Sequence, residues 1–152
     1  MNTRQATIAD RNILIQLRLD FLQAERGQLT DAEETSAREQ MAAYFTRHLG
    51  TDFLAFLADI DGRAVSTVFL VVTERPASPM FATGRIGTLL NVFTYPEYRR
   101  QGLSTDLLLQ AIREARRLGV SSIELSATPD GKPVYEKLGF TEAKYPHMRL
   151  SL

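Results

Sequence analysis

The chain has 152 residues, 44% of them hydrophobic and 24% charged, and its 18 basic and 18 acidic residues balance to a net charge of zero. This length and composition predict a single domain, residues 1–152, and the balanced charge argues against a nucleic-acid or membrane-surface partner. The absence of cysteine excludes a disulfide framework, thiolate metal ligands and a cysteine nucleophile.

Metal binding and membrane insertion are also disfavoured. The two histidines, His48 and His147, are far apart and lack the spacing of metal ligands, so we expect no metal. Residues 1–5 lack the apolar core of a signal peptide, and no apolar run approaches the ~20 residues that span a bilayer. We therefore expect a cytoplasmic protein without a membrane partner.

The first third of the chain predicts one short strand and two helices. Residues 6–8 form the expected strand, and Asp10 caps a helix that ends at Gly27. Arg18 lies on the apolar face of this helix. Either its stem packs on the core with its head in water, or it points into a pocket and meets an anionic group. A capping box opens the second helix, which covers residues 30–49.

The middle of the chain predicts three strands. Residues 53–60 and 64–73 form a hairpin around Asp61 and Gly62, because this pair of residues suits a type I′ turn. A proline-containing loop follows, and residues 86–94 form the third strand of this group.

The last third predicts two helices and two further strands. An amphipathic helix starts at Gly102, and a strand follows at residues 122–126. Thr128, followed by proline, starts a short helix, and residues 148–150 form a terminal strand. The order β-α-α-β-β-β-α-β-α-β predicts an α/β (α+β) fold in which helices flank one mixed sheet.

Two arginines and a glycine lie between the predicted strand at residues 86–94 and the amphipathic helix. Arg99 and Arg100 directly precede the helix, and Gly102 removes a side chain where a ligand would approach. The first N–H groups of a helix are free and carry partial positive charge, so they bind phosphate well. No P-loop and no Rossmann glycine motif is present. The pattern predicts a pyrophosphate site; the alternative is a pair of solvated charges.

Two short motifs follow one another in the second half of the chain. The first contains Arg99, Gly102 and Ser104, and the second is Tyr135 followed by Lys-x-Gly-Phe at residues 137–140. With these motifs the chain resembles the GNAT superfamily of acetyl-CoA-dependent N-acetyltransferases, whose pyrophosphate motif is Gln/Arg-x-x-Gly-x-Gly/Ala. The order of elements agrees along essentially the whole chain, so the resemblance also implies a mostly antiparallel GNAT-like sheet.

The resemblance implies a site for acetyl-CoA as the acetyl donor. In the family, the strand before the motif separates from its neighbour and its backbone binds the pantetheine arm, while helix amides bind the pyrophosphate. The residues implied here are Val92, Phe93, Thr94, Arg99, Arg100, Gln101, Gly102, Leu103, Ser104, Thr105 and Thr128. Two of them depart from the family pattern, because Ser104 replaces a smaller residue and Thr128 stands where many relatives have asparagine.

Tyr135 is the expected catalytic residue, because in the family a tyrosine at this place can protonate the departing CoA thiolate. A tyrosine with a pKa near ~10 is protonated at neutral pH and can supply that proton. Transfer from a thioester also needs a positioned carbonyl and donors for the developing oxyanion. No covalent enzyme intermediate is required, so we expect direct attack by an amine. The alternative for Tyr135 is a core aromatic residue.

Arg18, Asn91 and His147 are the candidate residues for binding the acceptor. Asparagine is disfavoured inside a strand, so Asn91 either has a polar task at the acceptor or pairs with a neighbouring loop. His147 is either a general base or a surface histidine. Three acidic residues at helix ends either take the proton of the amine or complement the helix dipoles: Glu25, Glu33 and Glu34.

The sequence thus predicts an N-acetyltransferase that moves acetyl from acetyl-CoA to a primary amine of a small molecule or peptide in a ternary complex. One alternative is a non-catalytic acyl-CoA-binding or regulatory module of the same fold. Another is an unrelated nucleotide-binding domain that uses the helix end for a different phosphate. The sequence does not specify the acceptor, and the resemblance leaves a homodimer open.

Overall fold

The computed structural model describes residues 1–152, and its one sheet has the strand order β1-β2-β3-β4-β5. The first four strands are antiparallel neighbours, whereas β4 and β5 are parallel. The strands are β1 (Asn2–Gln5), β2 (Phe53–Ile60), β3 (Arg63–Glu74), β4 (Arg85–Thr94) and β5 (Ser122–Glu124). The predicted mixed, mostly antiparallel sheet is confirmed.

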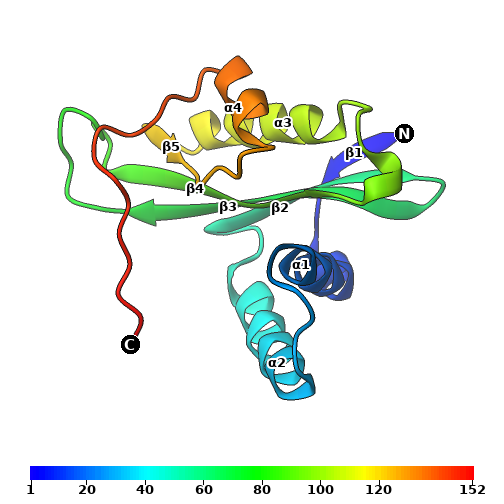
Figure 1. The fold of residues 1–152 in the computed structure, drawn as a ribbon. Helices are drawn as coiled ribbons and strands as arrows, with labels where there is room; N and C mark the ends of the chain where they lie inside the picture. Colours follow the sequence, from blue (N-terminus) through cyan, green and yellow to red (C-terminus); the bar gives the residue numbers. More distant parts are fainter.

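Helices cover both faces of the sheet (Figure 1). One face carries α1 (Arg11–Arg26) and α2 (Asp31–His48), and the other carries α3 (Leu103–Arg117) and the short α4 (Lys132–Lys137). Two 3-10 turns, Ile8–Asp10 and Pro96–Tyr98, precede α1 and α3. No helix is both long and apolar enough to cross a bilayer.

The core therefore has two layers, one on each side of the sheet. Along β2, Leu54 and Phe56 pack in the layer that contains α3, whereas Phe53 and Leu57 pack in the layer that contains α1 and α2. Successive residues of a strand point to opposite faces, and a strand covered on both faces is apolar throughout. This explains why the sequence of β2 is a continuous apolar run.

The local predictions for the central hairpin and for α3 are confirmed. Asp61 and Gly62 have φ values of 51° and 78°, as the two central residues of a type I′ turn require. The apolar stripe of α3 is buried against the sheet, with Leu107 and Leu108 inaccessible to solvent.

The prediction of a first strand at residues 6–8 is wrong. β1 lies earlier and pairs with the end of β2, where Arg4 is opposite Leu57. Ile8 belongs to the following 3-10 turn and is exposed. Apolar residues at positions 6–8 do not mark the strand, because β1 is an edge strand. An edge strand is defined by backbone hydrogen bonds to its one neighbour, and its side chains need not be apolar.

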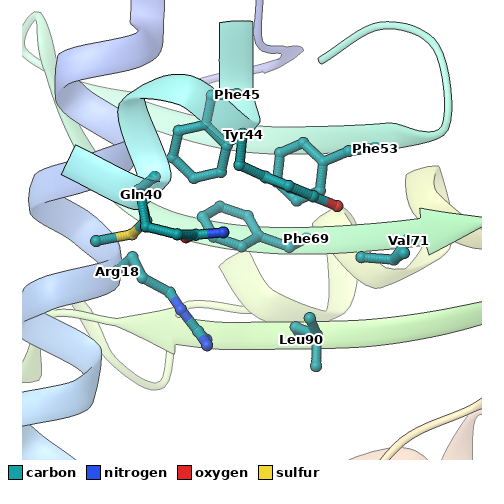
Figure 2. Close-up of a pocket in the computed structure, with 9 residues that line it drawn as sticks. Arg18, Gln40, Tyr44, Phe45, Phe53, Phe69, Val71 and Leu90 are labelled. Carbon is teal, nitrogen blue, oxygen red and sulfur yellow. The ribbon is translucent and has the colours of Figure 1, made fainter. Parts of the chain in front are cut away.

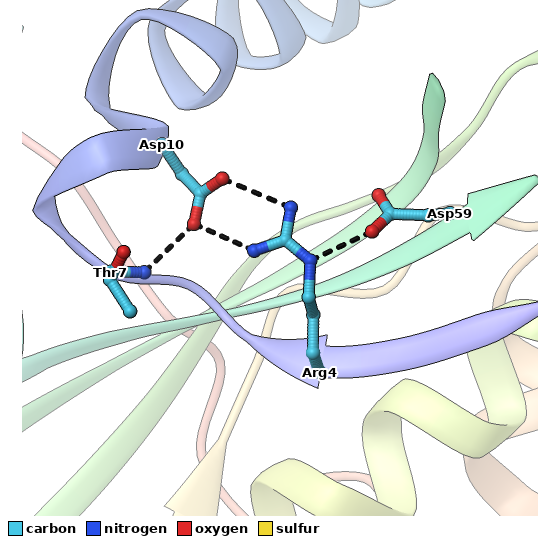
Figure 3. Close-up of polar contacts among 4 residues, drawn as sticks. All are labelled: Arg4, Thr7, Asp10 and Asp59. Carbon is cyan, nitrogen blue, oxygen red and sulfur yellow. Dashed lines mark hydrogen bonds and ion pairs between the residues drawn. The ribbon is translucent and has the colours of Figure 1, made fainter. Parts of the chain in front are cut away.

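Arg4 joins β1 to both β2 and the start of α1 (Figure 3). Its Nε donates to Asp59 Oδ2 at 2.7 Å, and its Nη1 and Nη2 donate to the two carboxylate oxygens of Asp10 at 2.8 and 3.0 Å. Asp10 also accepts from the backbone N–H of Thr7 at 2.9 Å. Asp10 precedes α1 as predicted, but its carboxylate makes no capping bond to that helix and serves the ion pair instead.

The predicted terminal strand at residues 148–150 is also wrong. Residues 141–152 form no helix or strand, and Met148 and Leu150 expose 86% and 83% of their surface. The alternating apolar residues suit a strand, but no neighbouring strand forms a hydrogen-bonded ladder with them, and a strand requires one. Similarly, β5 ends at Glu124, two residues earlier than predicted, where its pairing with β4 stops.

Candidate active site

The site is built around the point where β4 and β5 separate. The two strands pair from Ile86 with Ser122 to Thr88 with Glu124, and no further. Beyond Thr88, β4 continues to Thr94 with only β3 as its neighbour. Backbone groups on the free side of β4 are therefore available to an extended ligand. The strand separation that the resemblance implied is present.

A β-bulge lies in this unpaired part of β4. Asn91 and Val92 together face one residue of β3, Val68. Asn91 has φ = 53°, in the left-handed region that asparagine adopts more readily than most residues. Its side chain is buried, with Oδ1 accepting from Arg18 Nη1 at 3.3 Å and Nδ2 lacking a partner. An unpaired buried amide is a group that a ligand can satisfy.

Hydroxyl groups connect the end of β4 to the start of α3. Thr94 Oγ1 lies 2.7 Å from Ser66 Oγ on β3 and 2.9 Å from Ser104 Oγ in the first turn of α3. Arg99 Nε donates to the carbonyl oxygen of Thr94 at 3.0 Å. Ser104 therefore positions the helix through its hydroxyl, which explains how serine is accommodated at this place in the motif.

The N-terminus of α3 has the backbone of an anion site. Arg100 and Gly102 have φ values of 63° and 79°, and left-handed residues beside a helix start gather N–H groups on one side. The first intrahelical bond runs from Asp106 N–H to Gly102 O at 3.0 Å, so the N–H groups of residues 103–105 have no partner in the helix. A Cβ atom at Gly102 would meet nothing within 4 Å. The space in front of the helix is open, as a diphosphate requires.

The two arginines of the motif add charge without being neutralised. None of the ion pairs of the protein involves Arg99 or Arg100. Both side chains are exposed, as is Gln101 between them and Gly102. Their charge is thus free to act on an anion at the helix N-terminus.

Tyr135 lies on α4, on the other side of the sheet from α1. Its side chain is 9% exposed, and its ring packs edge-on against the ring of Phe140, with 6.0 Å between the two ring centroids. Burial raises the pKa of Tyr135, and the negative charge of Glu25 raises this pKa further. Glu25 itself lies in the last turn of α1. Tyr135 thus stays protonated at neutral pH.

A cavity of about 140 Å³ lies between α1, α2 and the sheet. Its wall is mainly aromatic and aliphatic (Figure 2), with contributions from Tyr44, Phe45, Phe53, Phe69, Val71 and Leu90. The polar side chains in the wall are Arg18 and Gln40, together with the hydroxyl of Tyr44. Leu90 immediately precedes the bulge, so the cavity lies next to the separated part of β4.

Arg18 is half-buried at this cavity and extends from α1 toward Leu90 (Figure 2). Burial lowers the pKa of Arg18, as does the nearby charge of Arg26, whereas Glu25 opposes this shift. No carboxylate forms an ion pair with Arg18. Arg18 therefore lies at a pocket, and the anionic partner that one of its two alternatives includes stays a prediction.

Four candidates from the sequence are exposed or engaged in local contacts. His147 lies in the exposed terminal segment. Glu33 accepts from the backbone N–H of Thr30 at 2.9 Å as part of a helix cap, and Glu34 pairs with Arg38 at 3.0 Å. Thr128 Oγ1 accepts from the N–H of Gly131 at 3.2 Å, so it caps a turn ahead of α4 rather than the helix itself.

His48 has a structural position. Its Nδ1 lies 2.8 Å from Asp52 Oδ1, and its ring packs on Tyr44 with 4.6 Å between centroids. Groups of three or more histidine or acidic side chains that could hold a metal ion do not occur.

Sequence reasoning missed the aromatic wall of the cavity. Tyr44 and Phe45 were recognised only as parts of the apolar stripe of α2, and the pairing of Tyr95 with Asp20 was not anticipated. The Tyr95 hydroxyl donates to Asp20, and burial together with this bond raises the pKa of Tyr95 to about 12. The available sequence signal was the pair of adjacent aromatic residues, Tyr44 and Phe45, on α2.

Comparison with solved structures supports the same architecture. A predicted acetyltransferase from Clostridium acetobutylicum, solved with acetyl-CoA, is 25% identical, with 97% of this chain and 95% of that chain covered and a TM-score of 0.85. A GCN5-related N-acetyltransferase from Ralstonia eutropha is 20% identical, with 98% and 97% covered and a TM-score of 0.82. Glucosamine-6-phosphate N-acetyltransferase from Arabidopsis thaliana is 18% identical, with 98% and 97% covered and a TM-score of 0.69. The last two share the fold.

Comparison with curated proteins finds no match. The model of the acetyltransferase (GNAT) family, by contrast, matches residues 18–140. The matched range includes Arg18, the bulge at Asn91, the start of α3 and Tyr135. The chain therefore belongs to the GNAT acetyltransferase family.

Proposed function

We propose that this protein transfers an acetyl group from acetyl-CoA to a primary amine by direct attack in a ternary complex. The observation that carries the proposal is the separation of β4 from β5 directly before an α3 N-terminus whose N–H groups are free. A backbone edge and an anion site in this order match the extended arm and the diphosphate of coenzyme A.

The residues expected to hold acetyl-CoA are those of β4 and the α3 start. The free backbone edge at Val92, Phe93 and Thr94 would bind the pantetheine arm. The N–H groups of residues 101–105 would bind the diphosphate, and Arg99 and Arg100 would add charge. Bound acetyl-CoA supplies an activated acetyl thioester. Thr128 stays a prediction as a cofactor residue, since its hydroxyl already caps a turn.

The chemistry that this chain would supply is positioning and one proton. The bulge at Asn91 would bring unpaired backbone beside the reacting carbonyl, where N–H donors would stabilise developing negative charge. Tyr135 would donate its hydroxyl proton to the departing sulfur, because its raised pKa keeps it protonated. The chain has no cysteine, and direct attack requires no covalent enzyme intermediate.

Glu25 is the strongest candidate for attracting the amine or taking its proton. Among the three acidic residues considered from the sequence, it is the one at the C-terminal end of α1, exposed and without an ion pair. Glu33 and Glu34 are engaged in helix-end contacts. We therefore keep Glu25 for this role and set His147 aside.

The test combines binding and turnover on the full chain. Calorimetry should show saturable binding of acetyl-CoA that ATP does not displace, and a panel of primary amines should include one that releases free CoA. Binding of acetyl-CoA without CoA release from any amine would favour the alternative, a non-catalytic acyl-CoA-binding module. Absence of acetyl-CoA binding would contradict the proposal. The cytoplasmic location, the single domain over residues 1–152 and a homodimer stay predictions.

A further inference from the structure

We propose that the acceptor is an apolar α-amino acid, whose carboxylate binds Arg18 and whose side chain fills the cavity between α2 and the sheet. This inference rests on the proposed function, because it assigns the acceptor of the same reaction. It follows from three properties of the cavity: an unneutralised cation, an apolar wall of limited size, and a position beside the bulge of β4.

The first property is the charge of Arg18. Arg4, by contrast, satisfies its guanidinium with the carboxylates of Asp10 and Asp59. Arg18 has only the neutral oxygen of Asn91, at the long distance of 3.3 Å, and the ring of Phe21 at 5.9 Å. Burying half of a guanidinium without an anionic partner costs free energy, because the charge loses part of its hydration. A ligand with an anionic group would offset this cost. The planar guanidinium matches a carboxylate in a two-bond geometry.

The second property is the wall of the cavity. Its aromatic and aliphatic side chains favour an apolar group. The volume of about 140 Å³ is close to that of an engineered protein cavity, about 150 Å³, known to hold benzene. The cavity therefore suits one ring or one branched aliphatic side chain, such as those of phenylalanine and leucine.

The third property is the position relative to the proposed acetyl site. Leu90 lines the cavity and Asn91 bonds Arg18, and these two residues directly precede Val92, where the pantetheine arm is expected. In an α-amino acid the amine, the carboxylate and the side chain are attached to one carbon. With the carboxylate on Arg18 and the side chain in the cavity, the amine would be free to face β4, whose Leu90 lines the same cavity.

A carboxylate fits better than a phosphate. Arg18 is the only basic residue in the wall of the cavity, and its single positive charge matches the single negative charge of a carboxylate. A phosphate monoester carries more charge and is expected to require a second cation. Amines without a carboxylate would bring positive charge toward Arg18 without neutralising it, so they should bind more weakly.

The experiment measures binding of L-phenylalanine and L-leucine to the CoA-loaded protein by calorimetry, beside phenethylamine and isopentylamine, which lack the carboxylate. We expect the amino acids to bind about ten- to a hundredfold more tightly than these amines, as a charge-assisted hydrogen-bonded pair supports. Arg18→Met should remove this preference, and Arg18→Lys should restore part of it. Arg113→Met is the matched control, because Arg113 is an exposed arginine on α3, on the opposite face of the sheet. This substitution should leave the preference for amino acids unchanged.

The turnover readout follows the same pattern. Arg18→Met should raise KM for the amino acids, whereas kcat/KM for phenethylamine should rise, because the positive charge that opposes its ammonium group is removed. The inference is overturned if neither amino acid binds, if the carboxylate-free amines or phosphoserine bind better, or if Arg18→Met retains the preference. These outcomes are distinct from failure of the proposed function, which would show as loss of acetyl-CoA binding with the amino-acid binding to the free protein unaffected.

Discussion

Thr94 Oγ1 on β4 lies 2.9 Å from Ser104 Oγ on α3, and the same oxygen lies 2.7 Å from Ser66 Oγ on β3. This chain of hydroxyls fixes the N-terminus of α3 relative to the free edge of β4. The two proposed parts of the coenzyme A site, the strand edge and the helix end, are therefore held in one geometry before any ligand binds. Such preorganisation reduces the entropy that binding must overcome.

Thr94→Val tests this connection, because valine keeps the shape of threonine and removes the hydroxyl. We expect a loss of about 1–2 kcal/mol in the free energy of unfolding, since two neutral hydrogen bonds disappear in a buried place. Urea denaturation measures the change, and acetyl-CoA affinity should fall with it. Thr88→Val, in the same strand with no side-chain bond, is the control and should shift stability by less than about 0.5 kcal/mol. Equal effects of both substitutions would contradict the structural role of the hydroxyl chain.

Gly102→Glu should abolish acetyl-CoA binding. The glutamate side chain would project into the open space in front of α3, where its charge would repel a diphosphate. A non-glycine residue at φ = 79° also costs about 1–2 kcal/mol of stability. Gly62→Glu separates the two effects, because Gly62 has nearly the same φ, 78°, and equally open surroundings. Calorimetry should show unchanged acetyl-CoA affinity for Gly62→Glu, and retained affinity for Gly102→Glu would refute the helix-end site.

Tyr135→Phe should lower kcat by about a hundredfold, the lower end of the range for a general acid, because a thiolate leaves without full protonation. Acetyl-CoA affinity should stay nearly the same, since the ring and its contact with Phe140 are retained. Steady-state kinetics with the best amine of the panel measures the effect. Tyr145→Phe, at an exposed tyrosine of the terminal segment, is the control.

The pH dependence of kcat gives a second test of Tyr135. Burial and the charge of Glu25 raise the pKa of Tyr135 above the ordinary tyrosine value of about 10. The proton-donating form is present below that pKa, so the decline of kcat that reports loss of this acid should lie above pH ~10. A decline near pH 8 that Tyr135→Phe removes would contradict this protonation state.

Asp10→Asn should weaken the junction of β1, β2 and α1. The hydrogen bonds from Arg4 lower the pKa of Asp10, against the opposing effect of burial, and the Thr7 N–H assists. A lowered pKa in the folded protein adds stability above the unfolded value of about 3.9, and this stability is lost as the pH falls through the folded value. We expect a loss of about 1–3 kcal/mol at pH 7 that becomes smaller at pH 3. Asp130→Asn, at an exposed loop residue, is the control; urea denaturation at both pH values is the measurement.

Features set by neighbours in the chain were predictable from the sequence. The hairpin turn at Asp61 and Gly62, the amphipathic face of α3 and the basic start of that helix are encoded within a few residues, because turn chemistry, helical periodicity and free N–H groups are local properties. The motifs at Arg99 to Ser104 and around Tyr135 are local too, and they sufficed to anticipate the family and the fold.

The tertiary structure decided what depends on residues far apart in the chain. The bulge at Asn91 exists because β3 pairs on both sides of it, and the environment of Arg18 depends on α2 and β4 closing a cavity around it. β1 lies at residues 2–5 because these residues pair with β2, with the ion pair between Arg4 and Asp59 beside them, and the terminal segment forms no strand because it lacks a pairing partner. Pairing and burial between distant segments are decided by the packed fold, and one-dimensional patterns do not contain them.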